Sequence, residues 1–240
     1  AGRITFPAGG SVISDISNAG MGITGTAADT GVLNPGVVLS TGVRIAVREL
    51  GPPSYGRWWN GLGAGGGFTL VSPDPLEEMN FPGSSGGVPA DASYAEIINS
   101  KLTSGTSYYV TIRVLDSAQP ANEQAYNLYG ATFTFDSSAG RAYITEPQSG
   151  RYYSSLYSLS GWSSDNVGTS TISLSVQQYL GLWYVPGSGF VSGTQSWFKA
   201  QGTPSAWDYD LGGQPWEPGG EYVVYSSATD MASNPQTVVS

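Results

Sequence analysis

Neither cysteine nor histidine occurs in this chain. Without cysteine there is no disulfide and no thiolate, and without histidine the common zinc ligand sets and the Ser-His-Asp triad are excluded. Hydrophobic burial must therefore hold each folded part together, which domains of about 100 residues can achieve. The sequence predicts a protein that is not an enzyme. Carboxylates between residues 77 and 96 keep a glycoside hydrolase as the catalytic alternative.

Charged side chains are scarce as well. They make up 11% of the residues, against about 25% in typical soluble proteins. The net charge is -9, so a polyanion is repelled and nucleic acid is excluded as a partner. No apolar run reaches the roughly 20 residues that span a bilayer, and we expect no membrane insertion. This acidic, hydroxyl-rich composition is typical of extracellular or cell-surface proteins.

Helical periodicity is nearly absent, and alternation with a period of two residues replaces it. In residues 171–176 the apolar side chains fall on one face and the hydroxyl groups on the other, which indicates a half-buried strand. Residues 43–47, 108–114 and 222–228 have the same pattern, and glycine and proline separate these segments. The sequence predicts an all-β fold.

One domain occurs twice. The landmark residues of the first part return in the second in the same order, which predicts two tandem domains at 1–138 and 139–240. The first domain carries loop insertions at 30–40 and 71–92. The matched pairs are Ile4 with Ile144, Pro7 with Pro147, Gly25 with Gly161, Asp29 with Asp165, Val43 with Ile172, Ile45 with Leu174, Val47 with Val176, Trp58 with Trp183, Phe68 with Phe190, Tyr94 with Trp207, Tyr108 with Tyr222, Asp116 with Asp230 and Asn122 with Asn234.

The second domain resembles the bacterial immunoglobulin-like (fibronectin III-like) tandem repeats of large extracellular surface or adhesin-type proteins. The residues that carry the resemblance are Ile144, Pro147, Leu159-Ser160-Gly161, Asp165-Asn166, Trp183-Tyr184, Phe190, Trp207, Tyr209, Gly220, Tyr222, Ala228-Thr229-Asp230, Ala232 and Asn234. The first domain is similar but departs from the pattern at its end. The resemblance implies two tandem immunoglobulin-like antiparallel β-sandwiches and no enzymatic activity.

The predicted function is a spacer, stalk or fibre segment of a surface or adhesin-like protein. Its partners are neighbouring repeats of the same array, and edge strands offer self-association into a filament. The alternative is a module that binds a glycan or a surface protein through exposed tryptophans or the first-domain insertion.

Six acidic residues are candidate calcium ligands, because the second and sixth strands of such a sandwich run toward the same end. Calcium takes six to eight oxygen ligands, and no other cofactor is expected. The alternative is that each aspartate accepts hydrogen bonds from its own turn. The candidates are Asp29, Asp116, Asp136, Glu146, Asp165 and Asp230.

Three tryptophans are candidate ligand-binding residues. Trp162, Trp197 and Trp216 have no aromatic counterpart in the first domain, so the shared core does not require them. Exposed aromatic faces stack on sugars, while ordinary surface packing is the alternative.

Overall fold

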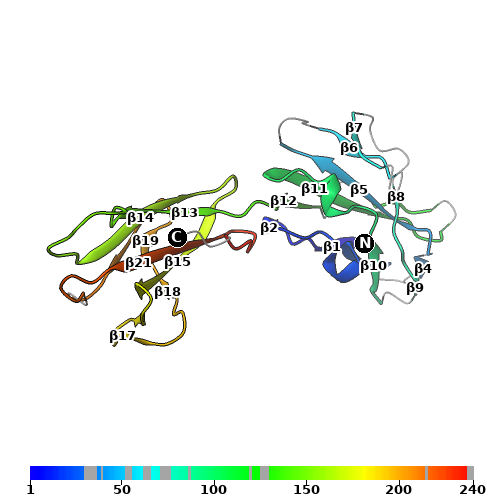
Figure 1. The fold of residues 1–240 in the computed structure, drawn as a ribbon. Helices are drawn as coiled ribbons and strands as arrows, with labels where there is room; N and C mark the ends of the chain where they lie inside the picture. The colour runs from blue at the N-terminus through cyan, green and yellow to red at the C-terminus, as the bar shows by residue number, and fades with distance from the viewer. Residues whose placement is uncertain are drawn as a thin grey trace. The chain divides into compact units, whose positions relative to one another are not determined.

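The computed structural model describes residues 1–29, 37–38, 40–51, 56–61, 66–70, 77–85, 88–118, 121–124, 130–213 and 216–236. The chain divides into two compact units, Ala1–Ser137 and Ser138–Ser240. Strands dominate both units (Figure 1), and the predicted all-β class is confirmed. No helix in these described ranges is long and apolar enough to cross a membrane.

The first unit contains two main sheets. The smaller has the order β1-β3-β10, formed by Gly2–Phe6, Ile23–Ala27 and Ala90–Tyr94. The larger has the order β2-β12-β11-β5-β6-β7, formed by Ser11–Ile13, Ala131–Phe135, Thr106–Val114, Val43–Glu49, Trp58–Trp59 and Phe68–Thr69. Three further strands are β8 (Glu77–Glu78), which pairs with β5, and β4 (Val37–Val38) with β9 (Ser84–Ser85). Two 3-10 turns, η1 and η3, cover Asn18–Gly20 and Asn99–Lys101.

The core of the first unit lies between its two main sheets. Along β11 the side chains of Tyr108, Val110 and Ile112 are almost fully buried, as the alternating sequence predicted. They belong to one apolar cluster with Ile4 and Ile23 of the smaller sheet. This sandwich-like arrangement explains why a unit without disulfides has a closed interior.

The second unit also contains two sheets. One has the order β13-β14-β20-β19, formed by Arg141–Glu146, Ser158–Ser164, Ala206–Asp210 and Gln201–Thr203. The other has the order β17-β16-β15-β18, with β21 paired to β15, and is formed by Gly189–Ser192, Trp183–Val185, Thr169–Gln178, Phe198–Lys199 and Tyr222–Asp230. Its core cluster combines Leu159 and Trp207 of the first sheet with Leu174 and Val176 of the second.

The two units share their strand registers. Tyr108 lies opposite Glu49 in the first unit, and Tyr222 lies opposite Gln178 in the second. Four more cross-strand pairs of the first unit have an equivalent pair in the second. They are Val43 opposite Val114 and Ile172 opposite Ala228, Arg48 opposite Trp58 and Gln177 opposite Trp183, Trp59 opposite Phe68 and Tyr184 opposite Phe190, and Ile4 opposite Gly25 and Ile144 opposite Gly161. Both units also have a cis proline after the first strand, at Pro7 and Pro147.

One matched pair was wrong. Tyr94 lies opposite Ile23, and the residue opposite Leu159 in the second unit is Tyr209. Tyr94 therefore corresponds to Tyr209, two residues beyond Trp207. The error arose because β20 carries two aromatic residues at alternate positions, Trp207 and Tyr209, and only the register decides which of them corresponds to Tyr94.

Trp207 instead lies over a glycine. Gly161 is its cross-strand neighbour, and a Cβ atom at Gly161 would meet Tyr143 O at 1.9 Å and Trp207 Cζ2 at 2.2 Å. The indole ring occupies the space that a side chain would need. In the first unit the residue opposite Gly25 is Ala92, and Ile112 Cδ1 lies 3.2 Å from the corresponding Cβ position.

We predict that Gly161→Ala lowers the free energy of unfolding of the second unit by about 1–3 kcal/mol, since Trp207 and the β13 backbone must move. Chemical denaturation followed by tryptophan fluorescence measures the change. Gly193→Ala is the control, because no atom of the residues that the structure describes lies within 4 Å of its Cβ position. Equal stability of the two variants would contradict the proposed close packing.

Candidate functional site

The same hydrogen-bonded loop follows the longest shared strand in both units. In the first unit Asp116 Oδ1 accepts the backbone N–H of Asn122 at 2.8 Å, and Asp116 Oδ2 accepts the Asn122 side-chain amide at 2.6 Å. In the second unit Asp230 accepts the two corresponding bonds from Asn234, both at 2.7 Å. The carboxylate thus closes the loop and satisfies its backbone.

The electrostatics of Asp116 follow from these bonds. The side-chain amide of Asn122 and then its backbone N–H lower the pKa of the Asp116 carboxyl group, because both hydrogen bonds favour the charged form. Asp165 has a similar local role, since its Oδ2 accepts the N–H groups of Val167 and Gly168 at 2.9 and 2.8 Å. These bonds are the ones expected under the alternative to calcium binding, in which each aspartate accepts hydrogen bonds from its own turn.

A glutamine follows each loop, half-buried at Gln124 and buried at Gln236, and the sequence analysis missed it. Gln236 Oε1 accepts the N–H groups of Ala142 and Ala228 at 2.7 and 3.1 Å. Gln124 Oε1 accepts the N–H of Gly2, the residue of the first unit that corresponds to Ala142. The glutamine therefore ties the first strand of each unit to its last loop. The spacing Asn-x-Gln, which recurs at 122–124 and 234–236, was the signal that could have revealed it.

A tyrosine corner also recurs. The N–H of Thr103 donates to the Tyr108 hydroxyl at 2.8 Å, and the N–H of Glu217 donates to the Tyr222 hydroxyl at 2.5 Å. In each case the donor lies five residues before the tyrosine. Burial raises the pKa of the Tyr108 hydroxyl, so this group stays neutral and acts as a structural acceptor.

The predicted calcium ligands do not all lie close together. Within the second unit the carboxylate oxygens of Asp165 and Asp230 lie within 4.8 Å of each other. Glu146 lies opposite Ser160, five residues along β13 from Arg141 at the Asp165 end, which is about 16 Å away. Glu146 therefore does not share a site with this pair, and the calcium site itself stays a prediction.

Besides Asp116, two further candidate ligands belong to the first unit. Asp29 is half-buried after β3, and Asp136 is fully buried after β12, where it accepts the Ser104 hydroxyl at 2.9 Å. Asp136 thus helps to hold the turn before β11, which is a structural role.

The three candidate tryptophans differ in exposure. Trp162 and Trp197 are 42% and 38% exposed, as predicted. Trp216 is half-buried, donates its indole N–H to Leu156 O at 2.7 Å and contacts Tyr222 with ring centroids 4.7 Å apart. The prediction that Trp216 is exposed was wrong, because this ring packs against the core cluster of the second unit.

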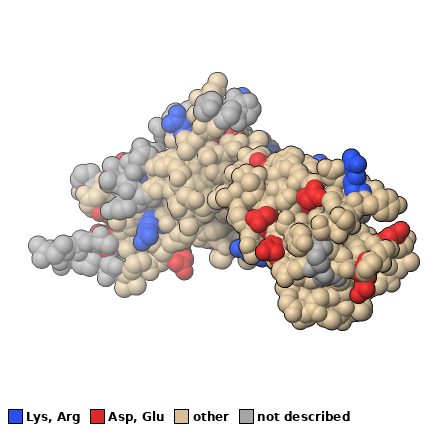
Figure 2. Space-filling view, turned by 90° about the vertical axis from the view of Figure 1, so that its left-hand side faces the viewer, with Lys and Arg blue, Asp and Glu red and all other residues tan. Residues whose placement is uncertain are grey.

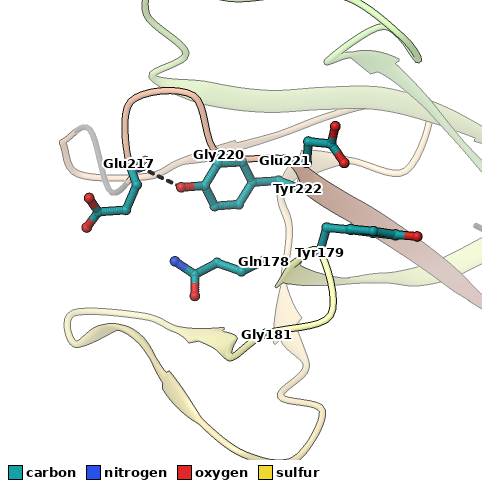
Figure 3. Close-up of a pocket in the computed structure, with 7 residues that line it drawn as sticks. All are labelled: Gln178, Tyr179, Gly181, Glu217, Gly220, Glu221 and Tyr222. Atoms are coloured by element: carbon teal, nitrogen blue, oxygen red, sulfur yellow. Dashed lines mark hydrogen bonds between the residues drawn. The ribbon is translucent and has the colours of Figure 1, made fainter.

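An open cleft of about 380 Å³ lies between the β15 end and the segment before β21 (Figure 3). Glu217 and Glu221 line it together with Gln178, Tyr179 and Tyr222. Figure 3 shows the two carboxylates pointing away from each other. They do not form the facing pair that glycoside hydrolysis requires.

One face of the molecule carries little charge. Figure 2 shows separate acidic and basic side chains on a face that is mostly uncharged. Models of known protein families give no match to the chain. A search of the curated proteins also finds no match.

We predict that Gln236→Ala destabilises the second unit by about 2–4 kcal/mol, because two buried N–H groups lose their acceptor. Urea denaturation of the full chain measures the effect. Gln124→Ala is the matched variant and should destabilise the first unit instead. The proposed role fails if both variants unfold at the wild-type urea concentration.

We predict a pH-dependent role for Asp116. Its lowered pKa stabilises the folded first unit above the ordinary aspartate pKa, and this contribution is lost as the pH falls through the folded-state value. Asp116→Asn should therefore reduce stability at pH 7 and differ less from the wild type near pH 2. Denaturation at both pH values tests this, and a constant difference would contradict it.

Proposed function

We propose that the chain is a non-catalytic structural segment, a spacer, stalk or fibre element of a large extracellular surface protein. It consists of two tandem immunoglobulin-like sandwiches. The observation that carries the proposal is that three polar features shared by both units satisfy backbone groups: the aspartate loop, the glutamine and the tyrosine corner. A chain repeated for its shape retains such contacts, whereas a catalyst retains a reactive site.

The immunoglobulin-like assignment is supported by the path of the first strand. In the first unit β1 pairs with β3 in the smaller sheet, and after Pro7 the chain crosses to the other sheet, where β2 pairs with β12. The larger sheet then continues through β11, β5 and β6. Sheet switching by the first strand, together with a tyrosine corner, is consistent with an immunoglobulin-like sandwich.

The same crossing suits a load-bearing role. β2 and β12 are parallel, with Ser11, Val12 and Ile13 opposite Phe133, Thr134 and Phe135. Force on the two ends of this unit pulls neighbouring parallel strands from opposite ends, so their hydrogen bonds are loaded together in shear. Bonds loaded together must break together, which raises the barrier to forced unfolding.

Neighbouring repeats of the same array are the proposed partners. Self-association through edge strands is the second proposed contact, because β13 and β19 end the four-stranded sheet in the described part of the second unit. An edge strand offers unpaired backbone groups to a neighbouring chain.

We predict that stretching single molecules gives two separate unfolding events. Their contour lengths should be on the order of 450 Å and 340 Å for units of 137 and 103 residues (Ala1–Ser137 and Ser138–Ser240). Ile13→Pro should lower the force of the longer event only. Asp136 N donates to Ile13 O, so the N–H of Ile13 also faces β12 in the extended strand, and proline removes it.

The shorter event is the internal control, since the substitution leaves the second unit untouched. A single cooperative event, or two events at forces too low to measure, would argue against a spacer that resists extension. An unchanged force for Ile13→Pro, with wild-type thermal stability, would refute the shear mechanism alone.

A further inference from the structure

The outer face of the β13-β14-β20-β19 sheet carries a stacked aromatic pair. Tyr143 and Trp162 are cross-strand neighbours whose ring centroids lie 4.2 Å apart with an interplanar angle of 17°. The side chains remain 37% and 42% exposed. Because β13 is the edge strand in the described part of this sheet, the outer side of the Tyr143 ring faces no further strand.

The next strand leaves the indole uncovered as well. Gly161 lies opposite Trp207, so Trp162 is next to Ala206, an exposed residue with a single methyl group. Thr203 lies opposite Ala206 on β19. The row across the sheet therefore runs from two large rings to two small side chains, and it forms a step beside the aromatic pair.

A polar row runs parallel to the aromatic row on the same face. Thr145 and Ser160 have hydroxyl oxygens 3.3 Å apart, Ser160 lies opposite Asp208, and Asp208 lies opposite Gln201. Asp208 and Gln201 are exposed. Hydroxyl, carboxylate and amide groups thus line the edge of an aromatic surface.

The fold does not require the aromatic pair. The first unit forms the same strand pair with Arg3 opposite Thr26, next to Ile4 opposite Gly25. These are the positions of Tyr143 and Trp162 beside Ile144 and Gly161. Two exposed rings at positions that the sister unit fills with polar residues are a surface feature specific to the second unit.

We propose that this face binds a neutral polysaccharide chain. A sugar ring has an apolar face of C–H groups that stacks on an aromatic ring, and a rim of hydroxyl groups that hydrogen-bond to carboxylate, amide and hydroxyl side chains. The aromatic row supplies the stacking surface and the polar row supplies the hydrogen bonds. The site goes beyond the proposed structural role, because a spacer needs no ligand.

Charge selects the class of polysaccharide. The chain has a net charge of -9, and Asp208 and Asp210 are exposed on β20. Arg141 also lies on this face, opposite Ser164. The negative field disfavours acidic polymers in spite of this arginine, so neutral hexose chains are the expected ligands.

The test is calorimetric titration of the full chain with cellohexaose, mannohexaose, chitohexaose and, as the acidic counterpart, hexagalacturonate. At least one neutral oligosaccharide should bind saturably. The double variant Tyr143→Arg, Trp162→Thr, which copies the pair found in the first unit, should weaken that binding about tenfold or more, the equivalent of about 1.4 kcal/mol. Its unfolding midpoint shows that the fold is retained.

Asp208→Asn isolates the polar row and should weaken binding without affecting the rings. Trp197→Phe is the matched control, because this exposed tryptophan lies between β17 and β18 and outside the face. Binding that survives the double variant, or is lost with Trp197→Phe alone, overturns the proposal. So does binding of hexagalacturonate only, or of none of the four.

Discussion

Both units depend on one constraint: backbone N–H and C=O groups need hydrogen-bond partners wherever the chain leaves a sheet. The protein has no disulfide and few ionic groups to hold such segments in place. Side-chain amides, carboxylates and hydroxyls meet this need. Asp116 and Asp230 close the loop that follows β11 in the first unit and β21 in the second, and Gln124 and Gln236 connect that loop to the first strand of each unit. An unsatisfied buried backbone group costs more than a made hydrogen bond gains, so these few residues matter more than their number suggests.

The sequence predicted the repetitive parts of the fold well. Alternation identified strands such as Thr106–Val114, and matched landmarks such as Tyr108 and Tyr222 occupy equivalent register positions. Trp207 was assigned to the wrong partner because a shift of two residues preserves the alternating pattern. Only pairing with β14, where Gly161 makes room for the indole ring, distinguishes the two alignments.

The candidate site was harder to predict because it depends on contacts between distant segments. Trp216 looked like a surface residue, yet its indole N–H reaches Leu156, 60 residues away in the sequence. Glu146 lies on β13, and Asp165 follows the neighbouring strand β14. Glu146 is nevertheless far from Asp165, because it lies at the end of β13 opposite to the Arg141 end, where Asp165 is found. Gln236 was missed because only the recurrence of Asn-x-Gln at 122–124 and 234–236 distinguishes it from other polar loop residues. The exposed rings of Tyr143 and Trp162 likewise become a surface only when β13 pairs with β14.

The crossing of the first strand between sheets has a consequence for synthesis. β2 pairs with β12, so a segment that leaves the ribosome early must wait until about 120 more residues have been made before it finds its partner. The first unit therefore cannot close its larger sheet during most of its own translation. Until then the edges of β2 and β11 are open to other chains, so a chaperone that shields nascent strands would act here at the time of greatest exposure.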